Sequence, residues 1–226
     1  MQLTFREIEK AFEIEEKTLY QWLNEYAMPA VKANDQYYFN SVEILEWALK
    51  TRIPLTPGAL KLCEKHRSGH DIFGSAMARG GIHFDVKGIT REEALKSALE
   101  LLPLPAHIQK PSLMEMLLSR EQLGTTAVGN GIAIPHVKHP VVLAGLEPVA
   151  GLFFLQQPID FEAVDGQKVH TLFFLLTSSF KIHLTLLSRL AFCLQDDLVQ
   201  AALAHHNREE LIAAFAVAEG KTVRED

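Results

Sequence analysis

The histidine at position 136 is the side chain whose neighbours most strongly suggest chemistry. It closes residues 129–136, which read GNGIAIPH. Two glycines around an asparagine favour a turn with dihedrals that other residues avoid, and the Ile-Ala-Ile that follows is typical of a short strand. Pro135 then fixes one dihedral and removes one backbone donor directly before His136. The sequence therefore predicts a single imidazole held at the end of a short strand.

Four roles for this imidazole are open from the residues alone: metal ligand, acid or base, phosphoryl carrier, or packed side chain. A metal site is disfavoured, because prolines at 135 and 140 oppose a helix that would align His136 with His139, and no carboxylate or cysteine cluster is near in sequence. A hydrolase would need a motif such as Gly-x-Ser-x-Gly, and a nucleotide site Gly-Lys-Ser/Thr; neither occurs. A phosphoryl carrier needs an exposed, neutral imidazole nitrogen and cationic or hydrogen-bonding groups for the phosphate oxygens. The residues permit that role and leave packing open.

Composition predicts a folded cytoplasmic protein. The 226 residues are 48% hydrophobic and 22% charged, enough for one medium domain or a small domain plus a medium one. The net charge of −6 gives no support to nucleic-acid binding through bulk charge. Cys63 and Cys193 are expected to be reduced and buried. We expect no signal peptide and no membrane insertion, because the start is charged and the apolar run at 151–155 is too short to span a bilayer.

Residues 1–52 are predicted to form two helices, a hairpin and a third helix. Thr4 and Glu7 have the spacing of a capping box at the start of the first helix. The hairpin is expected over residues 31–39, and Asn40 or Ser41 is expected to cap the third helix.

This order resembles the MerR-like or excisionase-type winged helix-turn-helix. The matching pieces are LT at 3–4, TLY at 18–20, MPA at 28–30, YF at 38–39 and ILEW at 44–47. The resemblance implies a second helix in the DNA major groove, with Lys17, Thr18 and Lys32 as the expected contacts. Over residues 1–56, however, six Lys and Arg stand against nine Asp and Glu, so phosphate neutralisation would be weak. A protein-interaction or dimerisation module is the alternative.

Residues 53–81 are predicted to be a linker and a connecting helix, broken by proline and glycine. His66 and His70 have a helical spacing that a metal could use, but Gly69 interrupts the helix and no third ligand is near. We therefore predict no metal and no cofactor.

From Ile82 onward, strands alternate with helices, which predicts an α/β sandwich with helices on both faces. Capping pairs mark two helices, Thr90 with Glu93 and Ser112 with Glu115. The remaining elements are expected as strands at 141–143, 149–155 and 169–176, a loop at 158–166, a helix beginning at Ser178 or Ser179, and helices at 198–204 and 208–218.

Residues 118–136, LSREQLGTTAVGNGIAIPH, resemble the signature of the enzyme IIA component of the phosphoenolpyruvate-dependent phosphotransferase system. The type is that of fructose and mannitol, and the nearest branch is the nitrogen-regulatory one. Further matches are QPIDF at 157–161, DGQ at 165–167, KIHL at 181–184 and LSRLA at 187–191. The similarity runs from about residue 82 to 211 and implies a mixed sheet flanked by helices, with residues 82–218 as the enzyme IIA-like domain.

The resemblance implies a site of three residues. His136 matches the histidine that accepts phosphate from the phosphocarrier HPr or its nitrogen-branch relative, and Arg120 and His183 match residues that line the same site. An arginine fork suits phosphate oxygens, a histidine can donate to them or tune His136, and a helix beginning near 178–179 adds the positive end of its dipole. Related chains read Pro-His-Gly-Lys where this one reads PHVKHP, so His139 could touch phosphate, although a loop position is favoured.

Three functions follow as hypotheses. The first is a regulatory protein in which phosphorylation of His136 changes what the N-terminal unit or a partner surface does. The second is a transport component that passes phosphate to a separate IIB protein. The third is an interaction protein that is not phosphorylated. Hydroxyls of Ser119, Thr125 and Thr126 could assist in the first two, or could satisfy the backbone instead.

Overall fold

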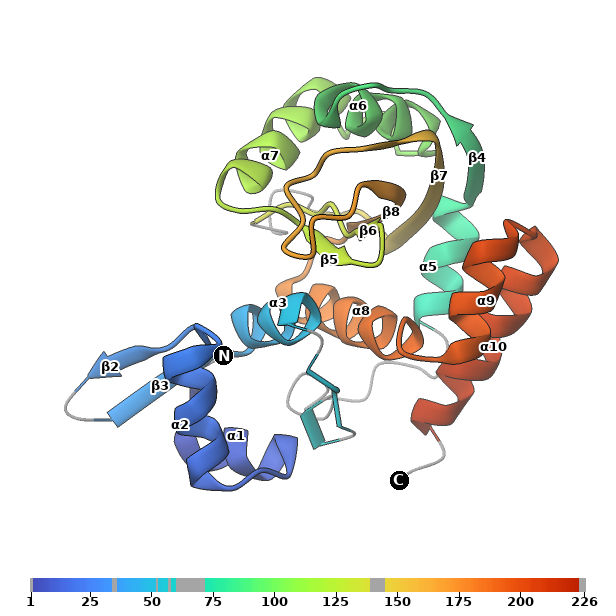
Figure 1. Ribbon diagram of the computed structural model, residues 1–226. Helices are drawn as coiled ribbons and strands as arrows, with labels where there is room; N and C mark the ends of the chain where they lie inside the picture. The colour runs from blue at the N-terminus through green and yellow to red at the C-terminus, as the bar shows by residue number, and fades with distance from the viewer. Residues whose placement is uncertain are drawn as a thin grey trace.

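A computed structural model describes residues 2–33, 36–51, 53–56, 58–59, 72–138 and 145–223 (Figure 1). Several sequence predictions lie outside these residues: the turn at 34–35, most of the connecting helix with Cys63, His66 and His70, the strand at 141–143, and His139.

Residues 2–51, here called the N-terminal unit, contain the elements expected and one short strand more. Its elements are β1 (Gln2–Thr4), α1 (Phe5–Phe12), α2 (Glu16–Glu25), β2 (Val31–Ala33), β3 (Gln36–Asn40) and α3 (Ser41–Thr51). The antiparallel sheet has the order β1-β3-β2. The strand β1 was not predicted, because three residues are too few to show an alternating pattern.

Local hydrogen bonds explain where these helices begin and end. The Thr4 amide donates to a Glu7 carboxylate oxygen at 2.8 Å, which is the predicted capping interaction at α1. The indole of Trp47 on α3 donates to the Tyr26 carbonyl at 2.7 Å and so ties α3 to the end of α2. The side chains of Leu3, Ile8, Leu19, Phe39 and Ile44 are buried between these elements.

Residues 72–223, here called the sheet unit, are built on a five-stranded mixed sheet. The strands are β4 (Ile82–Val86), β5 (Ala127–Gly129), β6 (Ile132–Ala133), β7 (Val149–Ile159) and β8 (Val169–Leu176), in the order β4-β7-β8-β6-β5. Strand β4 is parallel to β7 and β6 is parallel to β8, whereas β5–β6 and β7–β8 are antiparallel. The bounds of β8 are those predicted. The loop predicted from Pro158 is wrong at its start, because β7 continues past an irregularity so that Ile159 pairs with Val169.

Helices cover both faces of this sheet, as the predicted fold class requires (Figure 1). One face carries α6 (Arg91–Leu101) and α7 (Lys110–Gln122). The other carries α5 (Ile72–Gly80), α8 (Phe180–Cys193), α9 (Asp197–His205) and α10 (Arg208–Val223). Neighbouring residues of β7 point to opposite faces: Phe153 packs with the first set and Phe154 with the second. The strands are apolar on both faces because both faces are covered.

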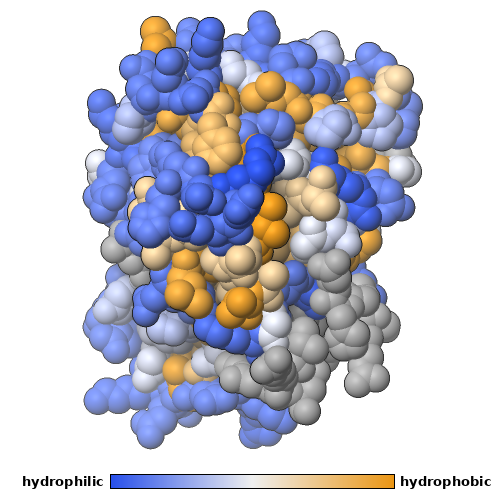
Figure 2. All heavy atoms as spheres, turned by 90° about the vertical axis from the view of Figure 1, so that its right-hand side faces the viewer, coloured by the Kyte–Doolittle hydropathy of each residue, from blue (hydrophilic) through white to orange (hydrophobic). Residues whose placement is uncertain are grey.

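Two helix boundaries differ from the prediction by two residues or more. Helix α7 begins at Lys110 and not at Ser112, because Pro111 fits the first turn of a helix, where its missing amide hydrogen costs nothing. Helix α10 continues to Val223. Helices α5 and α10 line an apolar hollow of about 450 Å³, and Figure 2 shows apolar side chains on this face of the molecule.

Helix α3 connects the two units. It packs against β5 and α8 of the sheet unit (Figure 1). The buried apolar side chains of α3, including Leu45 and Leu49, form one continuous cluster with those of β6 and α8. One side of α3 therefore faces the part of the sheet that carries His136.

The hairpin between β5 and β6 gives a test of this scaffold. Gly131 has a φ of +71°, and a Cβ added there would lie 2.3 Å from the His170 ring. Gly166 has a similar φ of +68° with nothing within 4 Å. We expect Gly166→Ala to cost about 1–2 kcal/mol from left-handed strain alone, and Gly131→Ala to cost at least about 1 kcal/mol more, because the His170 ring must also move. Urea unfolding of both variants measures the difference, and equal losses would contradict this packing.

Candidate functional site

The backbone around His136 fixes one nitrogen of its ring. The Pro135 carbonyl accepts a hydrogen bond from the Leu175 amide at 3.2 Å, and His136 forms a parallel bridge with Leu175, so the residues after β6 stay beside β8. The His136 Nδ1 atom lies 2.8 Å from the Ile134 carbonyl oxygen. Because a carbonyl only accepts, Nδ1 carries the proton in this contact. The Nε2 atom faces the rest of the site. It can attack phosphorus when it is unprotonated, and it can donate to a carboxylate only when the ring carries a second proton.

Arg120 reaches this nitrogen from the last turn of α7. Its Nε atom lies 3.2 Å from His136 Nε2, and its Nη1 atom donates to the Gly124 carbonyl at 2.9 Å. The neighbouring Glu121 is also buried; it accepts from the Thr126 amide at 3.2 Å and from the Thr126 hydroxyl. The Thr125 hydroxyl donates to the Phe161 carbonyl. The Thr125 hydroxyl therefore satisfies the backbone, which was one of the two roles expected for it, whereas the Thr126 hydroxyl bonds a side chain, and both hold the loop before β5.

His183 lies beside His136 in the first turn of α8. The two ring centroids are 4.9 Å apart with an angle of 36° between the planes, and both side chains are buried. Burial, together with the nearby His136 and Arg120 and against the opposing effect of Glu46, lowers the pKa of His183 to about 3. His183 is therefore neutral and keeps one N–H donor and one acceptor. The structure thus brings together Arg120, His136 and His183.

A fourth residue, Glu46 of α3, completes this cluster. One of its carboxylate oxygens lies 3.0 Å from His136 Nε2, and the other accepts from Arg120 Nη2 at 2.6 Å. Sequence reasoning missed Glu46, because it is 90 residues from His136 and a glutamate on an amphipathic helix is ordinarily solvated. The motif that contains it, ILEW at 44–47, pointed to a winged helix-turn-helix and not to this site.

The charges around Glu46 favour its ionised form. Burial alone would raise the pKa of Glu46, but the hydrogen bond to His136 and the charges of His136, Arg120 and Lys50 outweigh this effect and lower the pKa to about 2. Burial also lowers the pKa of Lys50, one turn further along α3, against the attraction of Glu46. The site is thus an arginine, a carboxylate and two imidazoles under a helix.

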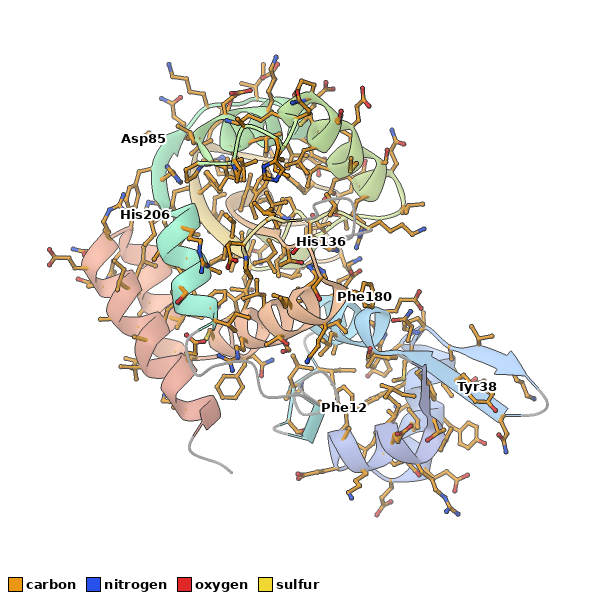
Figure 3. All side chains as sticks on the ribbon, turned by 180° about the vertical axis from the view of Figure 1, so that it is seen from behind. Phe12, Tyr38, Asp85, His136, Phe180 and His206 are labelled. Atoms are coloured by element: carbon orange, nitrogen blue, oxygen red, sulfur yellow. The ribbon has the colours of Figure 1, made fainter. Side chains whose placement is uncertain are left out.

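The exposed imidazole that a phosphoryl carrier needs is not seen in this structure. His136 is 4% exposed and Arg120 is 8% exposed. The space that remains beside Glu46, Arg120 and His136 is a cavity of about 10 Å³, which is about the room that one water needs. Figure 3 shows His136 inside the sheet unit, whereas Tyr38 of the β2–β3 hairpin lies at the outer edge of the N-terminal unit. The cover over His136 is the α3 helix.

The residues predicted to contact DNA lie on the surface of the N-terminal unit. Lys17 is exposed and Thr18 half-buried at the start of α2, and Lys32 on β2 is exposed, with its ammonium 5.8 Å from the Tyr37 ring centre. The structure does not bring these side chains to His136.

Other expectations concern metals, membranes and thiols. Among the described residues, no three His, Cys, Asp or Glu side chains form a group suited to a metal ion. No helix in the described part of the chain is long and apolar enough to cross a membrane.

Cys193 is a buried free thiol, and burial together with the nearby Glu219 raises its pKa to about 12. His170 packs on the β5–β6 turn and lies 2.8 Å from the Thr171 hydroxyl.

Residues 77–217 match the family model described as phosphoenolpyruvate-dependent sugar phosphotransferase system, EIIA 2. The chain belongs to this family. A nitrogen regulatory protein of Bradyrhizobium diazoefficiens is 43% identical over 110 residues, 47% of this chain and 69% of that protein. The nitrogen regulatory protein of Escherichia coli is 36% identical over 145 residues, 63% of this chain and 85% of that protein.

Solved structures agree with this assignment. The nitrogen regulatory protein IIA-Ntr of Neisseria meningitidis has a TM-score of 0.55 at 28% identity over 63% of this chain and 97% of its own. The mannitol IIA of Escherichia coli shares the fold, with a TM-score of 0.51 at 23% identity over 60% of this chain and 96% of its own. The family match begins at residue 77, so Glu46 lies outside it.

The low pKa of Glu46 makes a testable contribution to stability. The folded pKa of about 2 lies below the ordinary value of 4.5, so the contribution is complete above pH 4.5 and is lost as the pH falls toward 2. We expect Glu46→Gln to lower the free energy of unfolding by about 1–3 kcal/mol near neutral pH, with a smaller loss at acidic pH, because glutamine does not titrate. Urea unfolding at several pH values measures this difference. Glu43→Gln, an exposed change on the same helix, is the control, and a loss for Glu46→Gln that is independent of pH would contradict the ionic contact.

Proposed function

We propose that this protein is a regulatory phosphoryl carrier of the phosphotransferase system that accepts phosphate on Nε2 of His136. One observation carries the proposal: Nδ1 is held by the Ile134 carbonyl, while Nε2 faces the guanidinium of Arg120 beside the neutral ring of His183. An imidazole with one nitrogen held and the other beside a fixed cation is suited to phosphoryl transfer.

The transfer requires one bond to form and one to break. The Nε2 lone pair attacks phosphorus, and the bond from phosphorus to the donor breaks with its electron pair remaining on the donor. Arg120 stabilises the charge on the phosphoryl oxygens, and the N-terminus of α8, which carries His183 in its first turn, adds positive potential. The neutral His183 donates one hydrogen bond to a phosphoryl oxygen. The proton stays on Nδ1, which donates it in a hydrogen bond to the Ile134 carbonyl throughout, so no separate base is needed.

The donor that fits this chemistry is an HPr-type phosphocarrier protein. Support comes from the similarity to two nitrogen regulatory proteins. The matched region covers 69% of one of them and 85% of the other. The alternative is transport, in which His136 passes phosphate to a separate IIB protein. A chain of the solved complex of the Escherichia coli mannitol enzyme IIA and phosphorylated enzyme IIB shares the fold of this protein, at 22% identity and a TM-score of 0.52. We favour regulation, because the additional N-terminal unit contacts the site directly.

The division of the chain remains part of the proposal. Residues 1–52 would form a winged helix-turn-helix, 53–81 a linker with a connecting helix, and 82–218 the phosphocarrier domain. The helix–helix–hairpin–helix order of the N-terminal unit supports the first assignment. Its coupling to DNA through Lys17, Thr18 and Lys32 stays a prediction, since acidic residues outnumber basic ones there.

Phosphorylation can be tested with the full chain, phosphoenolpyruvate, enzyme I and an HPr-type carrier. We expect acid-labile, base-stable phosphate on the protein, because phosphate on an imidazole nitrogen has that stability. His136→Ala should abolish it, and Arg120→Met should slow labelling by about 100-fold if the guanidinium stabilises the transition state. His170→Ala is the matched control that removes a histidine outside the site. Equal labelling of the chain and His136→Ala, or none in any form, contradicts the proposal.

DNA binding is tested by a salt titration with mixed genomic DNA. If α2 and the hairpin contact phosphates, the double variant Lys17→Ala, Lys32→Ala should weaken binding and reduce the slope of log affinity against log salt by about 2. A chain that does not bind even at low ionic strength would contradict the DNA-binding part, while leaving the phosphocarrier part intact.

A further inference from the structure

Glu46 stands where the phosphoryl group of the proposed function would stand. A phosphorus atom bonded to His136 Nε2 must have its oxygens next to that nitrogen, and a Glu46 oxygen already lies 3.0 Å from it. The other Glu46 oxygen holds the guanidinium group that would bind phosphate, at 2.6 Å from Arg120 Nη2. The carboxylate therefore makes both contacts that a phosphoryl group needs.

The remaining space does not admit both anions. The cavity lined by Glu46, Lys50, Arg120, His136 and their neighbours is about 10 Å³, room for about one water. A phosphoryl group carries up to two negative charges and would face the ionised Glu46 at contact distance. Steric exclusion and like-charge repulsion therefore both oppose the presence of Glu46 and a phosphoryl group in the site at the same time.

We propose that α3 is an internal ligand of the phosphorylation site, so that docking of the N-terminal unit and phosphorylation of His136 exclude each other. This inference rests on the proposed function. In the docked chain Glu46 closes the site; in the phosphorylated chain the phosphoryl group takes over Arg120, and Glu46 with the rest of α3 leaves. Phosphorylation thereby exposes the face of α3 that packs on the sheet unit.

The surroundings of α3 fit a contact that can be broken. Apolar side chains such as Leu45 and Leu49 give the docked state part of its stability whatever the state of His136. The interface is also incompletely filled: a cavity of about 430 Å³ lies between the end of α3, the β5–β6 hairpin and α8, and Leu49, Val128 and Leu194 are among its lining residues. The contacts of Glu46 with Arg120 and His136 are then the part of the interface that a phosphoryl group on His136 would break.

Two variants separate the charge of Glu46 from its volume. Glu46→Gln removes the charge and keeps the size, and Glu46→Ala removes both. In the full chain, with phosphoenolpyruvate, enzyme I and the HPr-type carrier, we expect Glu46→Ala to speed labelling of His136 at least about tenfold, because the competent state is no longer the minor one. Glu46→Gln should speed it less. Glu43→Gln, an exposed change on the same helix, should label like the unaltered chain.

A second readout reports closure of the site without any phosphate. Diethyl pyrocarbonate modifies accessible imidazoles, and peptide mass spectrometry follows the modification of His136. We expect His136 to be protected in the unaltered chain and in Glu43→Gln, and to react in Glu46→Ala. The exposed His205 serves as the internal reference.

The outcomes distinguish the two proposals. Faster labelling together with greater reactivity of His136 supports the exclusion. Equal labelling rates and equal reactivity across the variants overturn it while leaving the phosphocarrier function standing. If no form is labelled, the phosphocarrier function and the competition with phosphate both fail, and the reactivity of His136 then decides only whether Glu46 closes the site.

Discussion

The site depends on a single carboxylate between a guanidinium and an imidazole. Arg120 is almost fully buried, and a buried cation without an anion is strongly destabilising. In the described structure the anion is Glu46, which accepts a hydrogen bond from Arg120 with one carboxylate oxygen and places the other 3.0 Å from His136 Nε2. Any state in which α3 leaves must give Arg120 either water or another anion. A phosphoryl group on His136 would be such an anion, bound next to the Arg120 guanidinium.

The sheet unit explains why the site lies where it does. Strand β8 is apolar on both faces and pairs with β7 and β6, so the segment after β6 is held against it through the Pro135 carbonyl. The same segment directs His136 toward the start of α8 and the end of α7, where His183 and Arg120 lie. The hairpin before it needs left-handed residues, and Asn130 and Gly131 supply them.

The sequence was informative wherever the cause was local or belonged to a long motif. Strand β8, the Thr4 and Thr90 caps and the start of α8 depend on nearby residues, and they agree with the predictions. The meeting of Arg120, His136 and His183 was expected because the motif of the family orders these residues along the chain. Strands β1 and β4 were not predicted, because each is short and lies outside the hairpin and the Gly-Asn-Gly turn that marked the other short strands.

Glu46 and the burial of His136 could not be predicted, because both come from the packing of α3 on Arg120 and His136, which lie 74 and 90 residues from Glu46 in sequence. Helix α3 is amphipathic, and its apolar face would be read as covering the N-terminal unit alone. Only the structure shows that the buried cluster continues into the sheet unit. A contact of this kind leaves no mark in a single sequence, since an ionic partner can be supplied from any exposed helix position.

Hydrogen exchange of the full chain, compared before and after complete phosphorylation of His136, tests the central claim most directly. Protection of the α3 and β5 amides reports the docked contact. The account predicts that phosphorylation speeds exchange in both elements while β7 and β8 stay protected. Unchanged protection of α3 and β5 in a chain fully phosphorylated on His136 would contradict it.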